Sequence, residues 1–277
     1  FLGTGVWVAL SMVGVSAIGM LLFTSRPVGD AMATTIWGTS SSWTLTALPL
    51  FVWMGEILFR TKLSKNLFKG LAPWLSRLPG GLIHVNVVGC ALFAAISGSS
   101  AATVATVGKM SIPELRKRNY PEKLLLGSLA GSGTLGLLIP PSIILIIYGV
   151  TVQESIAKLF IAGIIPGIML AIFFMLYVIG WSMLNKNIMP KMDETFSFSQ
   201  KIKDSSQLIP VIVLIVAVIG SIYVGIATAT EAASLGVVGA LILSFFQKSL
   251  NKETFKLSLL GATKTSGMIA FILACSS

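Results

Sequence analysis

The sequence predicts an all-α polytopic membrane protein, and its composition carries this prediction. Hydrophobic residues make up 55% of the 277 residues and charged residues only 11%, less than half of the roughly 25% that is usual in soluble domains. The mean hydropathy is +0.89, and apolar runs recur along the whole chain rather than in one terminal stretch. These properties exclude a soluble globular protein and predict helices solvated by lipid.

The apolar runs give the expected helices in order. One helical crossing needs about 20 apolar residues, and the chain has apolar runs at 1–23, 44–59, 82–108, 124–148, 157–184, 208–224, 230–246 and 259–277. The first run starts at once and the last ends without a polar flank, so we expect the sequence to be a piece of a longer one. The first run also lacks the basic start of a signal peptide, so we expect no cleavage there.

The positive charges predict the orientation of these runs. Four linkers hold 18 of the 20 Lys and Arg residues: 60–80, 109–123, 185–207 and 247–264. By the positive-inside rule these linkers are cytoplasmic, and 24–43, 149–156 and 225–229 lie outside. The net charge of +10 is explained by this pattern, and the chain has no aromatic and basic module that would bind nucleic acid.

One apolar run departs from this alternation. Residues 82–108 have basic linkers on both sides, so this run must enter from the cytoplasm and return to it. Its centre reads Ser97-Gly98-Ser99-Ser100, where the tip of a re-entrant hairpin would lie, and each limb is too short to span. By the same reasoning, residues 207–246 cross twice, with a turn near 225–228.

A second irregularity interrupts the run 124–148. Pro140 and Pro141 remove two backbone donors, which leaves the carbonyls of Gly136 and Leu137 without their usual helical partners. Glycines precede them closely and loosen the backbone. We therefore expect a discontinuous helix whose unwound middle lies at the depth of the hairpin tip.

Unwound carbonyls and nearby hydroxyls could together hold a desolvated sodium ion, and half-helix N-termini attract an anionic substrate. The candidate hydroxyls are those of Ser97, Ser99, Ser100, Thr103, Ser132, Thr134 and Ser142. The alternative is that small residues and hydroxyls only allow close helix packing in lipid. Both interpretations stay open at this point.

The other polar residues in apolar runs have structural interpretations beside functional ones. Glu56 is an acid well inside a run, but it lies four residues from Arg60 and could be a scaffold contact. Glu231 is expected to cap an outer helix start, and His84 is expected to be a structural histidine rather than a proton relay. Cysteines Cys90 and Cys275 are isolated in apolar runs and are expected to be small packing residues. No catalytic serine or zinc motif and no P-loop is present, so we do not expect an enzyme.

Four segments together resemble a known family, the large membrane subunit of TRAP (tripartite ATP-independent periplasmic) transporters. They are 94–102 (AAISGSSAA), 136–142 (GLLIPPS), 159–167 (LFIAGIIPG) and 228–233 (TATEAA). Their order and spacing also match, and the similarity extends over essentially all of the chain. Family members usually have proline where this sequence has Ala229, which affects only the local turn.

The resemblance implies a sodium-driven importer in the inner membrane of a bacterium or archaeon. Such a transporter works with a small membrane subunit and a periplasmic substrate-binding protein, and its substrates are organic acids such as C4-dicarboxylates. No cofactor is expected apart from the coupling sodium ion. Competing hypotheses are a proton-coupled secondary carrier and a non-transporting membrane scaffold or channel-like subunit.

The resemblance also implies an elevator-type fold of inverted repeats with re-entrant hairpins and broken helices. Its parts would be scaffold helices (1–81), half of a transport domain (hairpin 82–108 and broken helix 124–148, within 82–148), a transmembrane helix with a cytoplasmic linker (149–206) and the opening helices of a second repeat (207–277). The implied sodium and substrate site comprises Ser97, Gly98, Ser99, Ser100, Thr103, Ser132, Gly133, Thr134, Gly136, Pro140, Pro141 and Ser142. We expect bound sodium to order both the tip and the break and so to complete the substrate pocket.

An internal match supports a repeat. Ala9, Ser11, Val15, Ala17 and Phe23 recur as Ala232, Ser234, Val238, Ala240 and Phe246, at a constant offset of 223 residues. In the expected topology these two segments cross in opposite senses, as an inverted repeat requires. The counterpart of the hairpin tip would fall beyond residue 277, so we expect a second hairpin and broken helix outside this sequence.

Overall fold

A computed structural model of the chain describes residues 3, 5–60, 63–190, 197–206 and 208–276, and these residues form helices and connecting turns without a strand. The helices are α1 (Val8–Phe23), α2 (Val28–Ser40), α3 (Ala47–Phe59), α4 (Leu63–Leu75), α5 (Ile83–Ser97), α6 (Ser100–Lys117), α7 (Glu122–Gly133), α8 (Ile143–Val152), α9 (Ile156–Leu184), α10 (Phe198–Ser205), α11 (Ile209–Tyr223), α12 (Ala229–Phe246) and α13 (Lys252–Ser276). Short 3₁₀ helices, η2 (Trp43–Thr46) and η3 (Thr134–Leu137), precede α3 and follow α7. The prediction of an all-helical chain is confirmed for the described residues.

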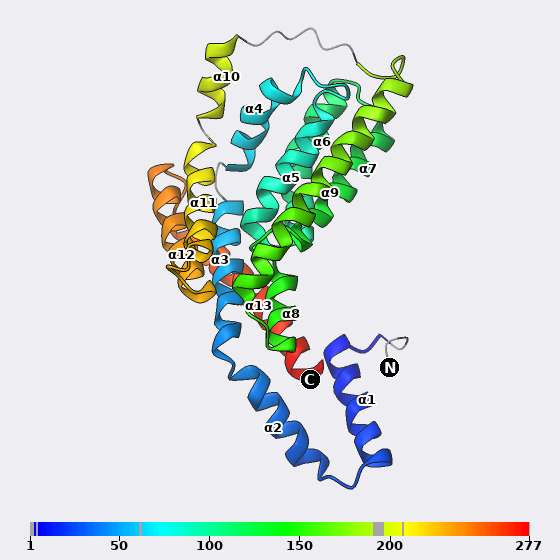
Figure 1. The fold of residues 1–277 in the computed structure, drawn as a ribbon, viewed down its shortest axis with the longest axis vertical. Helices are drawn as coiled ribbons and strands as arrows, with labels where there is room; N and C mark the ends of the chain where they lie inside the picture. Colours follow the sequence, from blue (N-terminus) through cyan, green and yellow to red (C-terminus); the bar gives the residue numbers. More distant parts are fainter. Residues whose placement is uncertain (1–2, 4, 61–62, 191–196, 207, 277) are drawn as a thin grey trace.

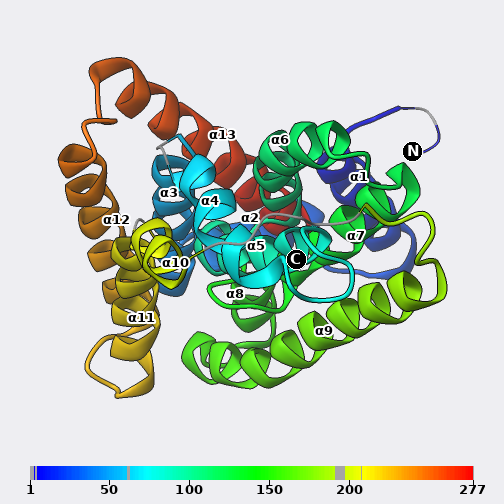
Figure 2. The same ribbon diagram turned by 90° about the horizontal axis from the view of Figure 1, so that it is seen from above.

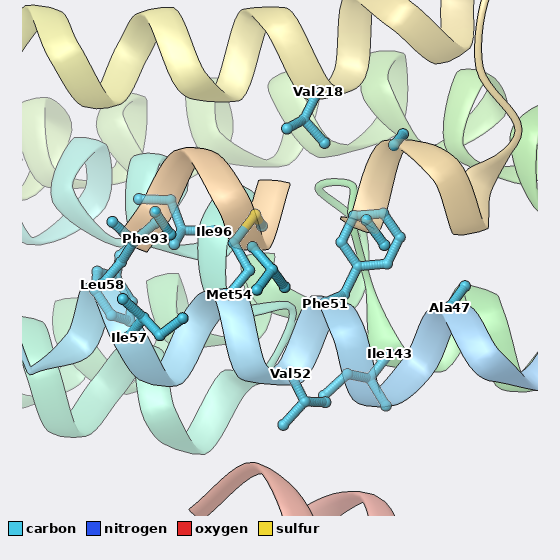
Figure 3. Packing of buried hydrophobic residues seen from close by; sticks show 14 of the residues in the cluster. Ala47, Phe51, Val52, Met54, Ile57, Leu58, Phe93, Ile96, Ile143 and Val218 are labelled. Atoms are coloured by element: carbon cyan, nitrogen blue, oxygen red, sulfur yellow. The ribbon is translucent and has the colours of Figure 1, made fainter. Parts of the chain in front are cut away.

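Helix α3 lies at the centre and packs against α5, α8, α12 and α13. Figure 3 shows its side chains, among them Phe51, Met54 and Leu58, directed into one apolar cluster with residues of α5, α8 and α11. Glycines allow the close approach: a Cβ on Gly55 would lie 2.9 Å from the Cα of Ser97, and one on Gly236 would lie 2.5 Å from the sulfur of Met54. Small residues of this kind favour association in lipid, where burial of apolar surface contributes little.

Helices α5, α6, α7 and α9 run side by side on one side of α3 (Figure 1). Helix α5 is the inner member of this group, since it contacts α3, α4, α6, α7 and α9, and apart from His84 and Asn86 near its start it is apolar around its whole circumference. A helix of that kind is buried, and Phe93 and Cys90 are fully buried on α5. The hairpin formed by α5 and α6 therefore has protein on several sides, as irregular backbone at membrane depth requires.

Three of the described helices, α9, α12 and α13, are long and apolar enough to cross a membrane. Helices α2 and α3 form a fourth candidate as a pair that is bent by 52° at the break between them. The hairpin limb α5 has 15 residues, less than the roughly 20 that a crossing needs. A multi-pass helical membrane protein is thus confirmed, and the short limb agrees with a re-entrant hairpin.

The segment 24–43, which the charge pattern places outside, is mostly helical, because α2 occupies Val28–Ser40. The segment is too polar for a span of its own, but that property does not prevent a short helix. Asp30 lies in the first turn of α2, where a negative charge stabilises the helix dipole. Lack of an apolar run was therefore a poor guide to local structure here.

The basic linkers are also more helical than expected. Helix α4 lies within 60–80, α10 lies within 185–207, and α13 begins at Lys252, so that Lys256 and Lys264 are helical residues. The side chain of Asn251 caps α13 by accepting from the backbone N–H of Thr254 at 2.6 Å. Lysine and glutamate are good helix formers, so the positive charges did not indicate where each helix ends.

Candidate functional site

The hairpin turns at the expected sequence. Helix α5 ends at Ser97 and α6 begins at Ser100, and Gly98 between them adopts the left-handed conformation at φ 59°. Glycine reaches this conformation without the steric cost that a side chain brings. A Cβ on Gly98 would also lie 2.5 Å from the carbonyl oxygen of Pro141, so the tip needs glycine for two reasons.

The predicted discontinuous helix is also present. Helix α7 ends at Gly133, the 3₁₀ helix η3 follows, and α8 starts only at Ile143, after the two prolines. The hydroxyl of Ser142 donates to the carbonyl of Leu137 at 2.8 Å, which replaces the backbone N–H that Pro141 lacks. The break is thus stabilised by a side chain from its own far end.

The tip and the break are in direct contact. The N–H of Ile143, the first residue of α8, donates to the carbonyl of Gly98 at 3.2 Å. Gly136 packs on the start of α6, where a Cβ would lie 3.0 Å from the backbone nitrogen of Ser100. A Cβ on Gly133 would collide with the side chain of Val104 on α6. The two irregular segments are therefore at the same depth and are held together by backbone contacts.

Hydroxyls concentrate at the tip. The Oγ of Ser97 lies 2.9 Å from the Oγ1 of Thr103 and 3.3 Å from the carbonyl of Ser99. The Oγ of Ser99 accepts from the N–H of Ala102 and caps α6. The Oγ of Ser100 is buried and has no hydrogen-bond partner among the described residues. These hydroxyl oxygens therefore lie close together in the sequence, at the end of α5 and the start of α6.

The hydroxyls of the broken helix are arranged differently. Ser132 is fully buried and donates to the carbonyl of Ser128 at 2.6 Å, and its oxygen lies 3.4 Å from the carbonyl of Asn86 on α5. The hydroxyl of Thr134 donates to the carbonyl of Gly131. Ser132 therefore faces the flank of α5, three helical turns before the hairpin tip.

Asn86 joins α5 to α7 and was not among the predicted site residues. It is fully buried, and its Nδ2 donates to the carbonyl of Leu125 at 3.3 Å and to the Oγ of Ser128 at 3.0 Å. A lone asparagine within an apolar run is the signal that could have found it, because such a side chain hydrogen-bonds across helices in lipid.

The remaining polar residues have structural partners. Glu56 pairs with Arg60 at 3.1 Å and packs on α13 where Gly261 leaves room for its carboxylate. Glu231 and Thr228 form a complete capping box at the start of α12, which confirms the expected capping role. The Nε2 of His84 lies 2.8 Å from the carbonyl of Pro79.

A cavity of about 790 Å³ lies away from the tip. The end of α2, the connection between α8 and α9, and the start of α12 all line it, through residues that include Thr39, Gln153, Glu154 and Thr230. These are the segments that the charge pattern places outside, and they converge around this one cavity. The candidate sodium and substrate residues are not part of its lining.

A helical membrane protein in which a hairpin packs tip-first on a broken helix has a framework that secondary transporters use. Comparison with protein families agrees, since the family model for the DctM component of the tripartite ATP-independent periplasmic transporter matches residues 1–277. The chain belongs to this family. The resemblance that the sequence motifs indicated is thus confirmed, as is the expectation that the chain is not an enzyme.

Curated relatives give the same result. The chain is 33% identical over 259 residues to the C4-dicarboxylate TRAP transporter large permease protein DctM of Pseudomonas aeruginosa, covering 93% of this chain and 60% of that protein. It is 34% identical over 250 residues to the 2,3-diketo-L-gulonate TRAP transporter large permease protein YiaN of Escherichia coli, covering 88% and 57%. It is 32% identical over 286 residues to the isethionate TRAP transporter permease protein DctMQ of Oleidesulfovibrio alaskensis, covering 100% and 43%. The chain thus spans about three fifths or less of the length of these relatives.

Proposed function

We propose that this chain is part of the large permease subunit of a sodium-driven importer for organic acids. The observation that carries the proposal is the seating of the hairpin tip on the broken helix, through Gly98, Gly136 and Ile143. Two irregular backbone segments that meet inside a membrane protein are a typical binding site for a coupling ion and its substrate. The names of the relatives, which include C4-dicarboxylate and 2,3-diketo-L-gulonate permeases, favour a small organic anion.

The sodium ion would be bound by oxygen atoms of the tip and the break. A hydroxyl that donates its hydrogen elsewhere still has lone pairs for a cation, so Ser97 and Thr103 remain suitable ligands. Ser100 is favoured because its buried oxygen has no partner among the described residues. Ser132 would act indirectly, because its hydrogen bonds lie along α7 and toward α5. Carbonyls near Gly136 and Pro140 would complete the site, with bound sodium ordering both segments.

The substrate would bind beside this ion. The N-termini of α6 and α8 both lie at the tip, and the exposed N–H groups at a helix start favour an anionic group. Gly98, Gly133, Gly136, Pro141 and Ser142 shape the surface on this side. The other side of the pocket would come from a second hairpin outside this sequence.

Transport would follow an elevator mechanism, in which the hairpin and the broken helix move together against scaffold helices. Support for the underlying repeat comes from helix bounds that agree with the offset of 223 residues: α1 ends at Phe23 and α12 ends at Phe246. The next helices begin at Val28 and Lys252, within one residue of the same offset.

The partners would be a small membrane subunit and a periplasmic substrate-binding protein, in the inner membrane of a bacterium or archaeon. The family description names a component of a tripartite transporter, and one relative carries the combined name DctMQ. Both names are consistent with a permease that works in a larger assembly.

The test is uptake of a dicarboxylate by the complete protein and its partners in proteoliposomes, with sodium varied outside. The double variant Ser97→Ala with Ser99→Ala removes two tip oxygens, so we expect the half-activating sodium concentration to rise roughly tenfold, the effect of about 1.4 kcal/mol of lost binding. The matched control is Ser234→Ala, which removes a hydroxyl from an exposed site on α12. It should leave the half-activating sodium concentration unchanged.

Other results would support the competing functions. Uptake driven by a proton gradient without sodium would indicate a proton-coupled carrier. Absence of coupled uptake in the complete assembly would indicate a scaffold or channel-like subunit. Unchanged sodium activation in the double variant would reject the site assignment but not sodium coupling itself.

A further inference from the structure

Two short helices from distant parts of the sequence, α4 and α10, pack together at one end of the protein (Figures 1 and 2). The indole Nε1 of Trp74 donates to the Oγ of Ser205 at 2.7 Å, and Ser205 donates to the carbonyl of Gly70 at 3.1 Å. The ring of Phe198 meets that of Trp74 edge to face, with centroids 6.5 Å apart. The two helices therefore form one defined surface, which we call the α4/α10 face.

This face exposes large apolar side chains. Trp74 is 48% exposed, Phe198 68% and Ile202 53%. Elsewhere, many exposed apolar residues lie on α9, α12 and α13, which are long enough to cross the bilayer. Helices α4 and α10 have 13 and 8 residues and cannot span it, so their apolar side chains need another explanation.

Basic residues lie on the same two helices and just after α4. The Nζ of Lys201 lies 5.4 Å from the centroid of the Trp74 ring, and Lys69, Arg77 and Lys203 are exposed. Residues 60–81 contain no Asp or Glu, and α10 contains a single acid, Asp204. The charge around the face is therefore strongly positive.

A short amphipathic helix with lysines beside aromatic and aliphatic side chains is typical of a segment that lies in the membrane interface. Tryptophan is enriched at this level because its ring is apolar and its N–H is polar. Basic residues near the interface attract anionic lipids, and the cytoplasmic leaflet, where the charge pattern places this end, is rich in them. Charge complementarity thus favours lipid over an apolar protein surface as the occupant.

We propose that the α4/α10 face binds an anionic phospholipid of the adjacent leaflet. The phosphate lies near the exposed side chains of Lys69 and Lys203, while Lys201 is buried against the Trp74 ring. The upper acyl chains pack on Trp74, Phe198 and Ile202. This inference goes beyond the proposed transport function and does not depend on it, since it concerns a different surface.

Quenching of Trp74 fluorescence by brominated lipids tests the proposal. The complete protein is reconstituted into phosphatidylcholine vesicles that contain a small fraction of brominated phosphatidylglycerol or of brominated phosphatidylcholine. Subtracting the signal of Trp74→Phe isolates the contribution of this residue from the six tryptophans of the sequence. We expect phosphatidylglycerol to quench Trp74 at a several-fold lower mole fraction than phosphatidylcholine does, with the preference weakening at high salt.

The charge contribution is tested by Lys69→Gln with Lys203→Gln. At low salt we expect the half-quenching mole fraction of phosphatidylglycerol to rise roughly fivefold for each lysine removed. Lys252→Gln with Lys256→Gln is the matched control, because it removes the same charge from exposed positions on α13, and it should keep the preference.

Two outcomes would overturn the proposal. Equal quenching by the two lipids would mean that the face touches lipid without selecting its charge. Absence of quenching by either lipid would mean that protein covers the face, from another part of a longer chain or from a partner subunit. A circular dichroism spectrum and a melting temperature for each variant establish that the variant is folded. A loss of quenching then reports a loss of lipid contact at the α4/α10 face rather than unfolding.

Discussion

Replacing Gly98 by alanine tests how the hairpin tip is held on the broken helix. The residue has φ 59°, a conformation that costs an L-amino acid with a side chain roughly 1–2 kcal/mol. The new Cβ would lie 2.5 Å from the carbonyl oxygen of Pro141 and 3.2 Å from the nitrogen of Ile143. Both neighbours are backbone atoms, so the tip itself must move.

The movement should break the hydrogen bond from Ile143 to Gly98, which is worth about 1 kcal/mol. Together the two effects give a loss of about 2 to 3 kcal/mol for the seated tip. If the tip opens before the rest of the protein, the loss appears as weaker binding at the proposed sodium site, and otherwise as a melting temperature lower by several degrees. Both quantities are measured on the complete protein in detergent or lipid.

Gly127→Ala is the control, because a Cβ at this helical position meets no atom within 4 Å. Alanine is a better helix former than glycine by up to about 1 kcal/mol, so this variant should be as stable as the parent or more stable. Gly98→Ala should therefore lower the stability of the protein, whereas Gly127→Ala should leave it unchanged or raise it. Unchanged melting and unchanged sodium binding in Gly98→Ala would refute the view that the tip is fixed by backbone contact.

Two further predictions concern the packing around the site. Gly133→Ala should destabilise the complete protein, because the new Cβ collides with the side chain of Val104. Adding Val104→Ala should restore the melting temperature. Failure of this rescue would show that the glycine is needed for another reason. Asn86→Leu should cost about 1 to 3 kcal/mol, because it removes two hydrogen bonds and leaves Ser128 without its amide donor. Ser128→Ala removes one of these hydrogen bonds and should lower the melting temperature less than Asn86→Leu does. Equal melting temperatures of the parent and Asn86→Leu would contradict the assigned role of this amide.

Local features of the sequence were sufficient to predict the irregular parts of the backbone. Paired prolines remove backbone donors wherever they stand, and the break before α8 lies at Pro140 and Pro141 as expected. The hairpin tip at Gly98 followed from basic linkers on both sides of a short apolar run. The turn before α12 also lies where it was predicted, with Gly225 at φ 75°.

The same local approach failed where no apolar run was present. Helix α2 lies in a segment between the predicted apolar runs, and α13 starts about two turns earlier than its apolar run. Hydropathy reports solvation by lipid and not the formation of backbone hydrogen bonds. Short polar or charged helices are therefore invisible to it.

The sequence by itself determined the class of protein and the positions of the tip and the break, and it predicts the orientation of the helices. Each of these follows from composition, from charge or from residues with unusual backbones, and none of them requires knowledge of a distant contact. Only the tertiary structure decided that Ile143 bonds to Gly98, that Ser132 faces α5, and that α4 pairs with α10. The physical reason is that helices such as α5 are apolar almost all round, so the sequence carries no continuous apolar stripe to indicate which side meets which neighbour. The rotation of each helix, and with it the direction of every hydroxyl, is set by packing against small residues elsewhere in the chain.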